Sequence, residues 1–419
     1  MDLLKSIFKG DKVIWIIFLF LCLISIVEVF SAASTLTYKS GDHWGPITQH
    51  SIILMVGAVV VVFMHNIPYK WFQVFPVFLL PLSVVLLALV MMMERINGAA
   101  RWMTFMGVQF QPSEVAKMAV IIVTAFILSK GQDEDGASPK AFKRIMIITG
   151  VICLLIAPEN LSTAALLFGV VYLMMFIGRV AMKKLLILAG GLAGVAIIGV
   201  TFLVLTKNSD LPFLHRFDTW RARIEKFTND NEVPAAKFDI AHARIAVATS
   251  HVVGKGPGNS VQRDFLSQAF SDFIFAIIIE ELGLIGGAFV VFLYVCLLIR
   301  VGRIAKKCER TFPAFLIIGI ALLLVSQAIF NMMVAVGLAP VTGQPLPLIS
   351  KGGTSTLINC AYIGMILSVS RYTARLEEQK EHDALIPMQV EVPAEETNSD
   401  AQTAAEPTAK VLNSDAEFE

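Results

Sequence analysis

The chain has 419 residues, of which 56% are hydrophobic and only 16% are charged, and its mean hydropathy is +0.71. Soluble domains carry about 25% charged residues, so this composition excludes a free-standing cytosolic enzyme and indicates an integral membrane protein. The net charge of +1 gives no reason to expect a nucleic-acid partner, and the five dispersed cysteines support neither a disulfide framework nor a zinc site.

Apolar stretches near 20 residues long predict ten membrane-spanning helices. The first of them has no cleavage context typical of a signal peptide, so it is interpreted as a retained span. We therefore expect an all-α polytopic membrane protein. Its predicted spans are residues 13–33, 47–66, 71–93, 113–129, 145–158, 162–178, 185–205, 273–299, 312–337 and 353–371.

The distribution of Lys and Arg orients these spans. The short connections on one side of the membrane hold 18 of these residues, and those on the other side hold 4. Cytoplasmic loops carry the excess of positive charge, and an even number of spans returns the chain to its starting side, so both termini are expected in the cytoplasm. The long connection 206–272, between spans seven and eight, is then extracytoplasmic, and its length favours a functional loop.

Two domains are predicted. Residues 1–375 form the membrane domain, and residues 376–419 form a cytoplasmic tail. From Glu381 to the end the tail has ten acidic residues against the single Lys410, among many Ala, Thr and Pro residues. This composition is typical of a disordered segment.

The fourth span is preceded by the motif QPSEVAK at 111–117. Pro112 cannot continue a helix but suits a helix start, so the helix is expected to begin there. The positive end of the helix dipole favours an anion at that point, such as a lipid-linked phosphate. Lys117 adds a positive charge one turn further along the helix. Glu114 and Lys117, at i and i+3, could instead form an ion pair that fixes the bundle. The two roles are compatible.

The connection between the fifth and sixth spans is a short turn, 158–163. Ser162 or Thr163 is expected to cap the sixth span. Glu159 is the only acid exposed in this turn and is a secondary functional candidate.

The long loop contains a glycine-rich stretch, 254–260, which includes Gly256 and Gly258. A GxGxG pattern alone is a weak signal, and no strand–helix unit surrounds it, so a dinucleotide-binding fold is excluded. Two interpretations stay open: a backbone loop that approaches a sugar or pyrophosphate, and a plain turn.

Asp272 lies where the long external loop meets the eighth span, at the water boundary and beside an apolar wall. A general base needs this position, although a first-turn acid that only stabilises a helix start would occupy it too. Glu280 and Glu281 lie two turns deeper, where charges must face protein or water rather than lipid. We expect these two residues to act as hydrogen-bonding supports.

The segment 337–355 contains three prolines and four glycines. Such a segment cannot form a lipid-facing helix, so it must be buried in protein or line a cavity, and we expect a re-entrant loop. Ser350 and Lys351 are candidate substrate contacts. Lys351 either meets a second phosphate or is solvated at the membrane surface.

The chain contains five sequence motifs, in this order: NGAARW (97–102), QPSEVAK (111–117), GKGPGNSVQ (254–262), SDFIFAIIIEELGLIG (271–286) and PVTGQPLPLISKGGTS (340–355). These motifs and their order resemble those of the SEDS family (shape, elongation, division and sporulation), which includes FtsW, RodA and SpoVE. Within the third motif, the stretch GNS at 258–260 is more similar to the division branch, FtsW, than to the elongation branch.

The resemblance implies a peptidoglycan glycosyltransferase that polymerises lipid II at the outer face of the bacterial cytoplasmic (inner) membrane, at the division septum. Its substrates would be lipid II and an undecaprenyl-pyrophosphate-linked glycan. Its partners would be a class B penicillin-binding protein transpeptidase and other divisome proteins, with no nucleic acid. The family's essential aspartate falls on Asp272, and its substrate-binding residues fall on Arg101, Glu114 and Lys117. Supporting positions are Trp102, Pro112, Gly256, Gly258, Glu280 and Glu281.

The implied reaction is a single inverting displacement. Asp272 would take the proton of the acceptor's 4-hydroxyl, and Lys117 and Arg101 would stabilise the leaving pyrophosphate. No cofactor is implied with certainty, and a divalent cation, Mg²⁺ or Mn²⁺, stays open as a further stabiliser. Two other functions stay open as alternatives: a lipid II flippase and a non-catalytic divisome scaffold, neither of which needs Asp272 as a base.

Three positions depart from the family's motifs. Ala100 replaces the first arginine of NGARRW, so one basic contact is lost or supplied elsewhere. The stretch PENLS at 158–162 replaces PDxGT, which weakens a functional role for Glu159. Lys351 stands where SYGGS has a tyrosine and adds a charge near the expected cavity.

Overall fold

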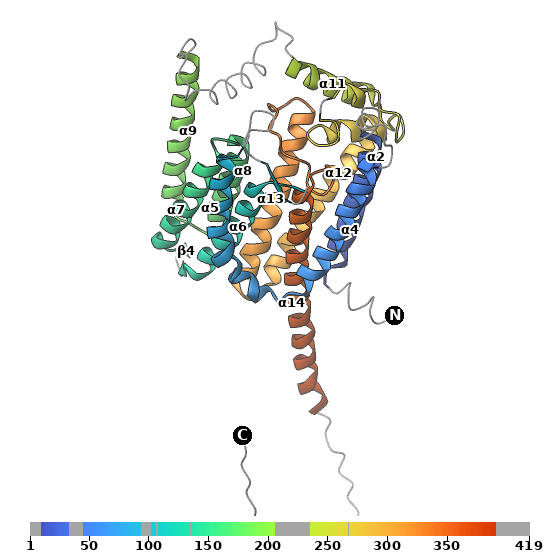
Figure 1. Cartoon of the computed structure of the whole chain (residues 1–419). Coiled ribbons are helices and arrows are strands. Elements are labelled where there is room, and N and C mark those ends of the chain that lie inside the picture. Colours follow the sequence, from blue (N-terminus) through green and yellow to red (C-terminus); the bar gives the residue numbers. More distant parts are fainter. Residues whose placement is uncertain are drawn as a thin grey trace, which may run out of the picture. The chain divides into compact units, whose positions relative to one another are not determined.

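The computed structural model describes residues 10–32, 45–93, 102–105, 108–133, 136–205, 235–266 and 268–390. The chain divides into two compact units, Met1–Arg375 and Leu376–Glu419. The first unit is a bundle of helices (Figure 1). Arg101, the 206–234 part of the long loop and the tail beyond residue 390 lie outside the described residues.

A helix coincides with each of the ten predicted apolar segments. Within the described residues, six of these helices are long and apolar enough to cross a membrane, namely α2, α4, α6, α9, α12 and α13, while α5 and α8 are apolar but shorter. The chain is therefore an all-α polytopic membrane protein. The helices are α2 (Lys12–Ala32), α4 (Gly45–Asn66), α5 (Phe75–Met91), α6 (Pro112–Lys130), α7 (Pro139–Ile156), α8 (Leu161–Ile177), α9 (Met182–Leu205), α12 (Ile274–Lys307), α13 (Thr311–Ala335) and α14 (Thr354–Val390).

Several predicted helix boundaries are wrong. Helix α7 begins six residues before the expected 145, because Ser138 caps it and accepts a hydrogen bond from the Ala141 N–H (3.3 Å). The third span loses its first residues to the 3₁₀ helix η1 (Tyr69–Gln73). Helices α12 and α14 continue beyond the expected ends because the Lys, Arg and Glu residues that end the apolar run are good helix formers.

Short elements lead into the helices. Strands β1 (Met103–Phe105) and β2 (Val108–Phe110) form an antiparallel hairpin directly before α6, and β3 (Gln132–Asp133) pairs with β4 (Gly136–Ala137) before α7. The prediction that a helix begins at Pro112 is confirmed. The long loop contains helix α11 (Ala235–Thr249) and the 3₁₀ helix η3 (Gln262–Asp264).

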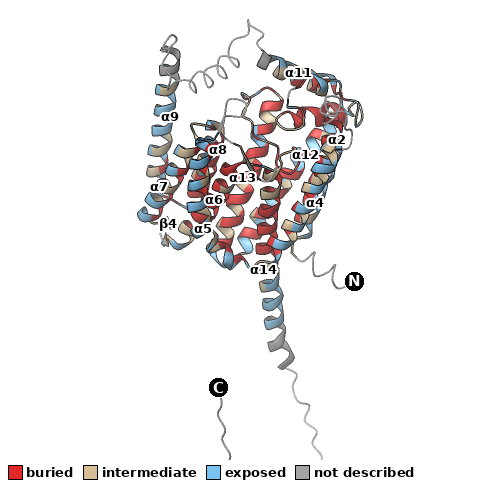
Figure 2. Ribbon diagram, viewed as in Figure 1, coloured by how far each residue is buried: buried red, intermediate tan, exposed pale blue. Residues whose placement is uncertain are grey.

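Burial is concentrated along α6, α13 and the first part of α14 (Figure 2). Helix α6 packs against α5, α7, α8 and α13, and α12 packs against α2, α11 and α13. Residues 359–370 of α14 are all buried. Helix α9 is the opposite case, because only 6% of its apolar stretch Met182–Gly199 is buried, and a lipid environment would cover the rest.

Helix α12 is broken at Gly283, where φ is 75° and ψ is −175°. The break removes hydrogen-bond partners from backbone groups on both sides of it, and each such group left unsatisfied in a membrane costs several kcal/mol. The turn 251–256 supplies the missing partners. Its four hydrogen bonds run from Leu284 N to His251 O (3.2 Å), Ile285 N to Val252 O (3.3 Å), Lys255 N to Glu280 O (3.0 Å) and Gly256 N to Glu281 O (2.8 Å).

This contact requires a glycine at position 254. Gly254 has a φ of +81°, and a Cβ atom there would lie 2.3 Å from the carbonyl oxygen of Glu281 and from the nitrogen of Gly283. A side chain would therefore meet rigid backbone rather than a movable group.

We expect Gly254→Ala to lower the free energy of unfolding by about 3 kcal/mol, because it combines an unfavourable φ with backbone overlap. Gly258→Ala is the matched control, since Gly258 has a φ of +85° and open space around its Cβ position. That control is expected to lose only about 1 kcal/mol. Unfolding in mixed detergent–SDS micelles measures both, and equal losses would contradict the close contact.

Candidate active site

Asp272 lies in the turn immediately before α12. Its backbone N–H donates to Gln268 O (3.1 Å), and its backbone oxygen accepts from Asn331 Nδ2 (3.1 Å). Ser271 Oγ donates to Asp272 Oδ1 (3.1 Å). The Asp272 side chain is half-buried, whereas the following Phe273 is only 1% exposed. The carboxylate thus stands at the edge of the apolar bundle on a backbone anchored on both sides.

The loop between α13 and α14 folds back against this turn. Ser350 Oγ donates to Ser271 O (2.8 Å), and Lys351 N donates to Phe270 O (3.0 Å). Lys351 Nζ lies 5.7 Å from the centre of the Phe270 ring, a cation–π geometry. Partial burial lowers the pKa of Lys351. The structure therefore brings both Ser350 and Lys351 next to Asp272.

The same loop is fixed from within the bundle by two buried amides. Asn331 Nδ2 of α13 also donates to Gln344 O (2.8 Å), and Gln344 Nε2 donates to Thr163 Oγ1 of α8 (2.6 Å). Residues 346–350 are all buried. The prediction that this segment is buried in protein is confirmed for these residues.

Glu114 and Lys117 form an ion pair in the first two turns of α6. Glu114 Oε1 and Lys117 Nζ are 2.8 Å apart, and their side chains are 3% and 0% exposed. Beyond this pair, neither Glu114 Oε2 nor Lys117 Nζ has a hydrogen-bond partner among the described residues. Because an ammonium carries three N–H donors, Lys117 keeps donors for a further oxygen.

The β1–β2 hairpin connects this helix start to α14. Gln109 O accepts a hydrogen bond from Thr354 Oγ1 (3.0 Å). Trp102, directly before β1, is half-buried. The candidate substrate contact Arg101 lies outside the described residues.

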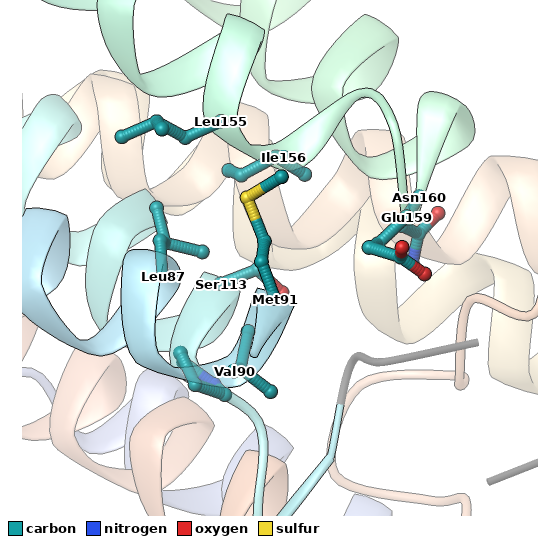
Figure 3. Close-up of a pocket in the computed structure, with 9 residues that line it drawn as sticks. Leu87, Val90, Met91, Ser113, Leu155, Ile156, Glu159 and Asn160 are labelled. Carbon is teal, nitrogen blue, oxygen red and sulfur yellow. The ribbon is translucent and has the colours of Figure 1, made fainter. Parts of the chain in front are cut away.

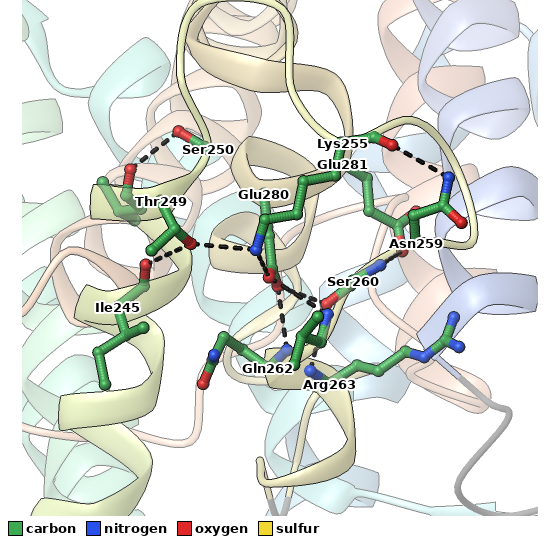
Figure 4. Close-up of polar contacts among 12 residues, drawn as sticks. Ile245, Thr249, Ser250, Lys255, Asn259, Ser260, Gln262, Arg263, Glu280 and Glu281 are labelled. Atoms are coloured by element: carbon green, nitrogen blue, oxygen red, sulfur yellow. Dashed lines mark hydrogen bonds and ion pairs between the residues drawn. The ribbon is translucent and has the colours of Figure 1, made fainter.

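Glu280 is surrounded by donors from the glycine-rich part of the long loop (Figure 4). Lys255 Nζ lies 2.6 Å from Oε1, and Ser260 Oγ donates to Oε2 (2.5 Å). The backbone N–H groups of Val261 and Gln262 each donate to this carboxylate at 3.2 Å. The Glu280 side chain is therefore fully used in holding the loop against α12.

Glu281 binds the same loop from the next position. The backbone N–H groups of Gly258 and Ser260 donate to it at 2.9 and 3.2 Å, and Ser31 Oγ of α2 donates to Oε1. Arg263 Nη1 donates to Ser31 Oγ (3.0 Å) and to Gly258 O (2.9 Å). The glycine-rich stretch thus points N–H groups at the protein's own carboxylates, which neither of the two sequence interpretations included.

A pocket lies between α5, α6, α7 and the turn that leads to α8 (Figure 3). Glu159 and Asn160 lie together at one end of it. The expected capping by Ser162 or Thr163 is wrong: Asn160 caps α8, because its Oδ1 accepts the Thr163 N–H (3.1 Å). The lining residues are Leu87, Val90, Met91, Pro112, Ser113, Leu155, Ile156, Glu159 and Asn160.

A metal site built from protein donors alone has no support in the described part of the chain, where no three His, Cys, Asp or Glu side chains are grouped to hold an ion. At the α12 start, the Asp272 carboxylate already accepts a hydrogen bond from Ser271 Oγ. Because Mg²⁺ is commonly bound by one or two carboxylates together with phosphate oxygens of a ligand, a divalent cation there would need further oxygens from a bound ligand.

Sequence analysis missed a polar stripe on α2. Ser25, Glu28 and Ser31 follow one another at three-residue spacing and are 0%, 0% and 3% exposed. Ser31 contacts Glu281, and Ser25 contacts His50 of α4. Polar residues at i, i+3 and i+6 inside an apolar run share one helix face, and this spacing is the signal that could have identified them.

The buried pair gives a test of its structural role. Lys117→Met leaves the Glu114 charge buried without a partner, so we expect a loss of about 3–5 kcal/mol in the free energy of unfolding. The double variant Glu114→Gln/Lys117→Met removes both charges and should lie within about 1 kcal/mol of wild type. Unfolding in mixed detergent–SDS micelles measures all three proteins. A double variant as unstable as the single one would refute this account.

Comparisons with known proteins give the relatives of this chain. It is 32% identical to the probable peptidoglycan glycosyltransferase FtsW of Geobacter metallireducens, over 88% of this chain and 96% of the relative. It is also 32% identical to the probable peptidoglycan glycosyltransferase FtsW of Halomonas elongata, over 86% of this chain and 90% of the relative.

Solved structures share the fold. A chain of a peptidoglycan synthase complex that coordinates polymerization and crosslinking matches with a TM-score of 0.70 and 24% identity, over 87% of this chain and 99% of that one. The rod shape determining protein RodA of Thermus thermophilus matches with a TM-score of 0.62 and 22% identity, over 87% of this chain and 97% of that one. The family model of the FtsW, RodA and SpoVE cell cycle proteins matches residues 11–375. Because this match covers most of its length, the chain belongs to that family of cell cycle proteins.

Proposed function

We propose that this chain is a peptidoglycan glycosyltransferase that polymerises lipid II into glycan strands. The observation that carries the proposal is the position of Asp272, which is partly exposed at the start of α12. The loop that carries Lys351 folds against the preceding turn, and the following Phe273 is buried. The names of relatives that share about a third of their residues with this chain support the same activity.

In the proposed reaction, Asp272 accepts the proton of the acceptor sugar's 4-hydroxyl while that oxygen attacks the anomeric carbon of the donor. One displacement forms the new glycosidic bond with inversion and releases undecaprenyl pyrophosphate. The hydrogen bonds from Asn331 and to Gln268 hold the Asp272 backbone. A fixed backbone lets the carboxylate meet the hydroxyl without first losing conformational freedom.

The departing pyrophosphate gains negative charge, which cations stabilise most strongly where water is excluded. Lys117 is fully buried and has N–H donors beyond its pair with Glu114, so it is the proposed contact for a phosphate oxygen. Arg101 and Lys351 are further proposed contacts. A divalent cation, if bound there, would add positive charge to the same oxygens.

We further propose ten spans with both termini in the cytoplasm, so that Asp272 faces the outer side of the inner membrane. Residues 206–272 are then extracytoplasmic, and residues 376–419 form a cytoplasmic tail, although the predicted disorder is wrong for residues 376–390, which continue helix α14. The proposed setting is the division septum, with a class B penicillin-binding protein and other divisome proteins as partners. The shared fold with a chain of a peptidoglycan synthase complex supports a transpeptidase partner.

The test is glycan-chain formation from fluorescent lipid II by the purified chain with its transpeptidase partner. Asp272→Asn should lower the rate by about 10²–10⁴-fold, because removal of a general base costs that much. Asp264→Asn is the matched control, since Asp264 is an acid of the same loop with a 59% exposed side chain and a 3.6 Å contact to Arg263. That control should keep the wild-type rate.

Fold and partner binding are checked by melting temperature and co-purification. Equal polymer from wild type and Asp272→Asn would refute the assignment of the base. No polymer from a folded wild-type complex would refute the transferase. Transbilayer movement of lipid II in proteoliposomes would then favour the flippase, and its absence the scaffold.

A further inference from the structure

Leu348, in the re-entrant loop, has a left-handed backbone conformation with a φ of +66°. This conformation is unfavourable for leucine because its Cβ atom crowds the following carbonyl oxygen. Leu348 is also only 2% exposed. Such strain persists only where the surroundings enforce it, and it is concentrated at functional sites.

The carbonyl groups on the two sides of Leu348 are both bound by buried hydroxyls. Tyr294 Oη of α12 donates to Pro347 O. Ser25 Oγ of α2 donates to Ile349 O at 2.6 Å. The Tyr294 and Ser25 residues are 3% and 0% exposed. Two helices far apart in sequence therefore hold the strained residue from both sides.

Helix α4 supports one of these hydroxyls. Ser25 has a single hydroxyl hydrogen, which it donates to Ile349 O. His50 Nε2 lies 2.8 Å from Ser25 Oγ, so the histidine nitrogen must be the donor in that contact. His50 thereby keeps the Ser25 hydroxyl directed toward the loop.

Residues 347–349 are connected through Ser350 to the turn that carries Asp272. Ser350 follows Ile349 directly, and its Oγ accepts from Leu346 N and donates to Ser271 O, both at 2.8 Å. A shift of residues 347–349 would therefore move the peptide next to Asp272.

We propose that Ser25 and Tyr294 are positioning residues that clamp the strained loop and thereby set the position of the Asp272 carboxylate. The inference rests on the proposed function, because it takes Asp272 as the base. Neither residue contacts substrate in this proposal. Their effect is on the rate of the chemical step, since a misplacement of about 1 Å at a reacting group costs on the order of 100-fold.

The variants Ser25→Ala and Tyr294→Phe each remove one hydroxyl of the clamp. In lipid II polymerisation by the full chain with its transpeptidase partner, each should lower kcat roughly 10- to 100-fold and leave KM within about twofold of wild type. Ser25→Thr keeps a hydroxyl and should restore most of kcat. Amide hydrogen exchange over 346–351 should become faster in the first two variants only.

Matched controls remove hydroxyls that bond elsewhere. Ser83 of α5 is fully buried and donates within its own helix to Leu80 O (2.8 Å), and Tyr172 of α8 donates to Leu185 O (3.4 Å). Ser83→Ala and Tyr172→Phe should leave kcat, KM and the exchange of 346–351 unchanged. Melting temperatures check the fold of every variant.

The proposal is overturned if Ser25→Ala and Tyr294→Phe keep the wild-type kcat, or if KM rises while kcat is kept. Unchanged exchange over 346–351 overturns it as well. If Ser25→Ala does not fold, Tyr294→Phe decides, because it removes the other hydroxyl of the clamp and tests the same loop independently. If wild type forms no polymer, the proposed function fails, and the exchange measurement still decides whether the clamp exists.

Discussion

The structure depends on satisfying the backbone of a broken helix inside a membrane bundle. The interruption of α12 at Gly283 would leave N–H and C=O groups unpaired, and a lipid environment offers no water to replace them. The turn 251–256 supplies four hydrogen bonds at this point. Once that turn is in place, residues 258–262 lie against Glu280 and Glu281, and the second half of the long loop becomes part of the bundle.

Three buried glutamates of the bundle also have partners within the protein. Glu114 is paired with Lys117 and Glu280 with Lys255, while Glu281 accepts hydrogen bonds from backbone and hydroxyl donors. Each of these three glutamates is at most 2% exposed. Asp272 differs from them because it is only partly buried. In the proposed reaction, this partial exposure lets a substrate hydroxyl reach the Asp272 carboxylate.

Hydropathy alone located the helices, because a span near 20 apolar residues is a strong and local signal. The helix ends were less predictable, as the early start of α7 at Pro139 shows, since a single capping serine moved it. The break at Gly283 closely follows Glu280 and Glu281, but two acids and a glycine within an apolar run do not by themselves predict a broken helix. Asp272, Ser350 and Lys351 were each recognisable from motifs, but their proximity depends on hydrogen bonds from the 350–351 segment to the turn before Asp272. The same holds for Ser25 and Ile349, which are 324 positions apart.

The glycine-rich stretch bears on where a phosphate can bind. Successive backbone N–H groups directed at one point form an anion site, and here the groups of Gly258, Ser260, Val261 and Gln262 face two carboxylates of the protein itself. A pyrophosphate at this place would have to displace buried charges that would then lose their partners, at a cost of several kcal/mol. In the proposed function, the anion of a lipid-linked substrate is therefore bound by cationic side chains elsewhere, and the start of α6, with buried Lys117, is the proposed place.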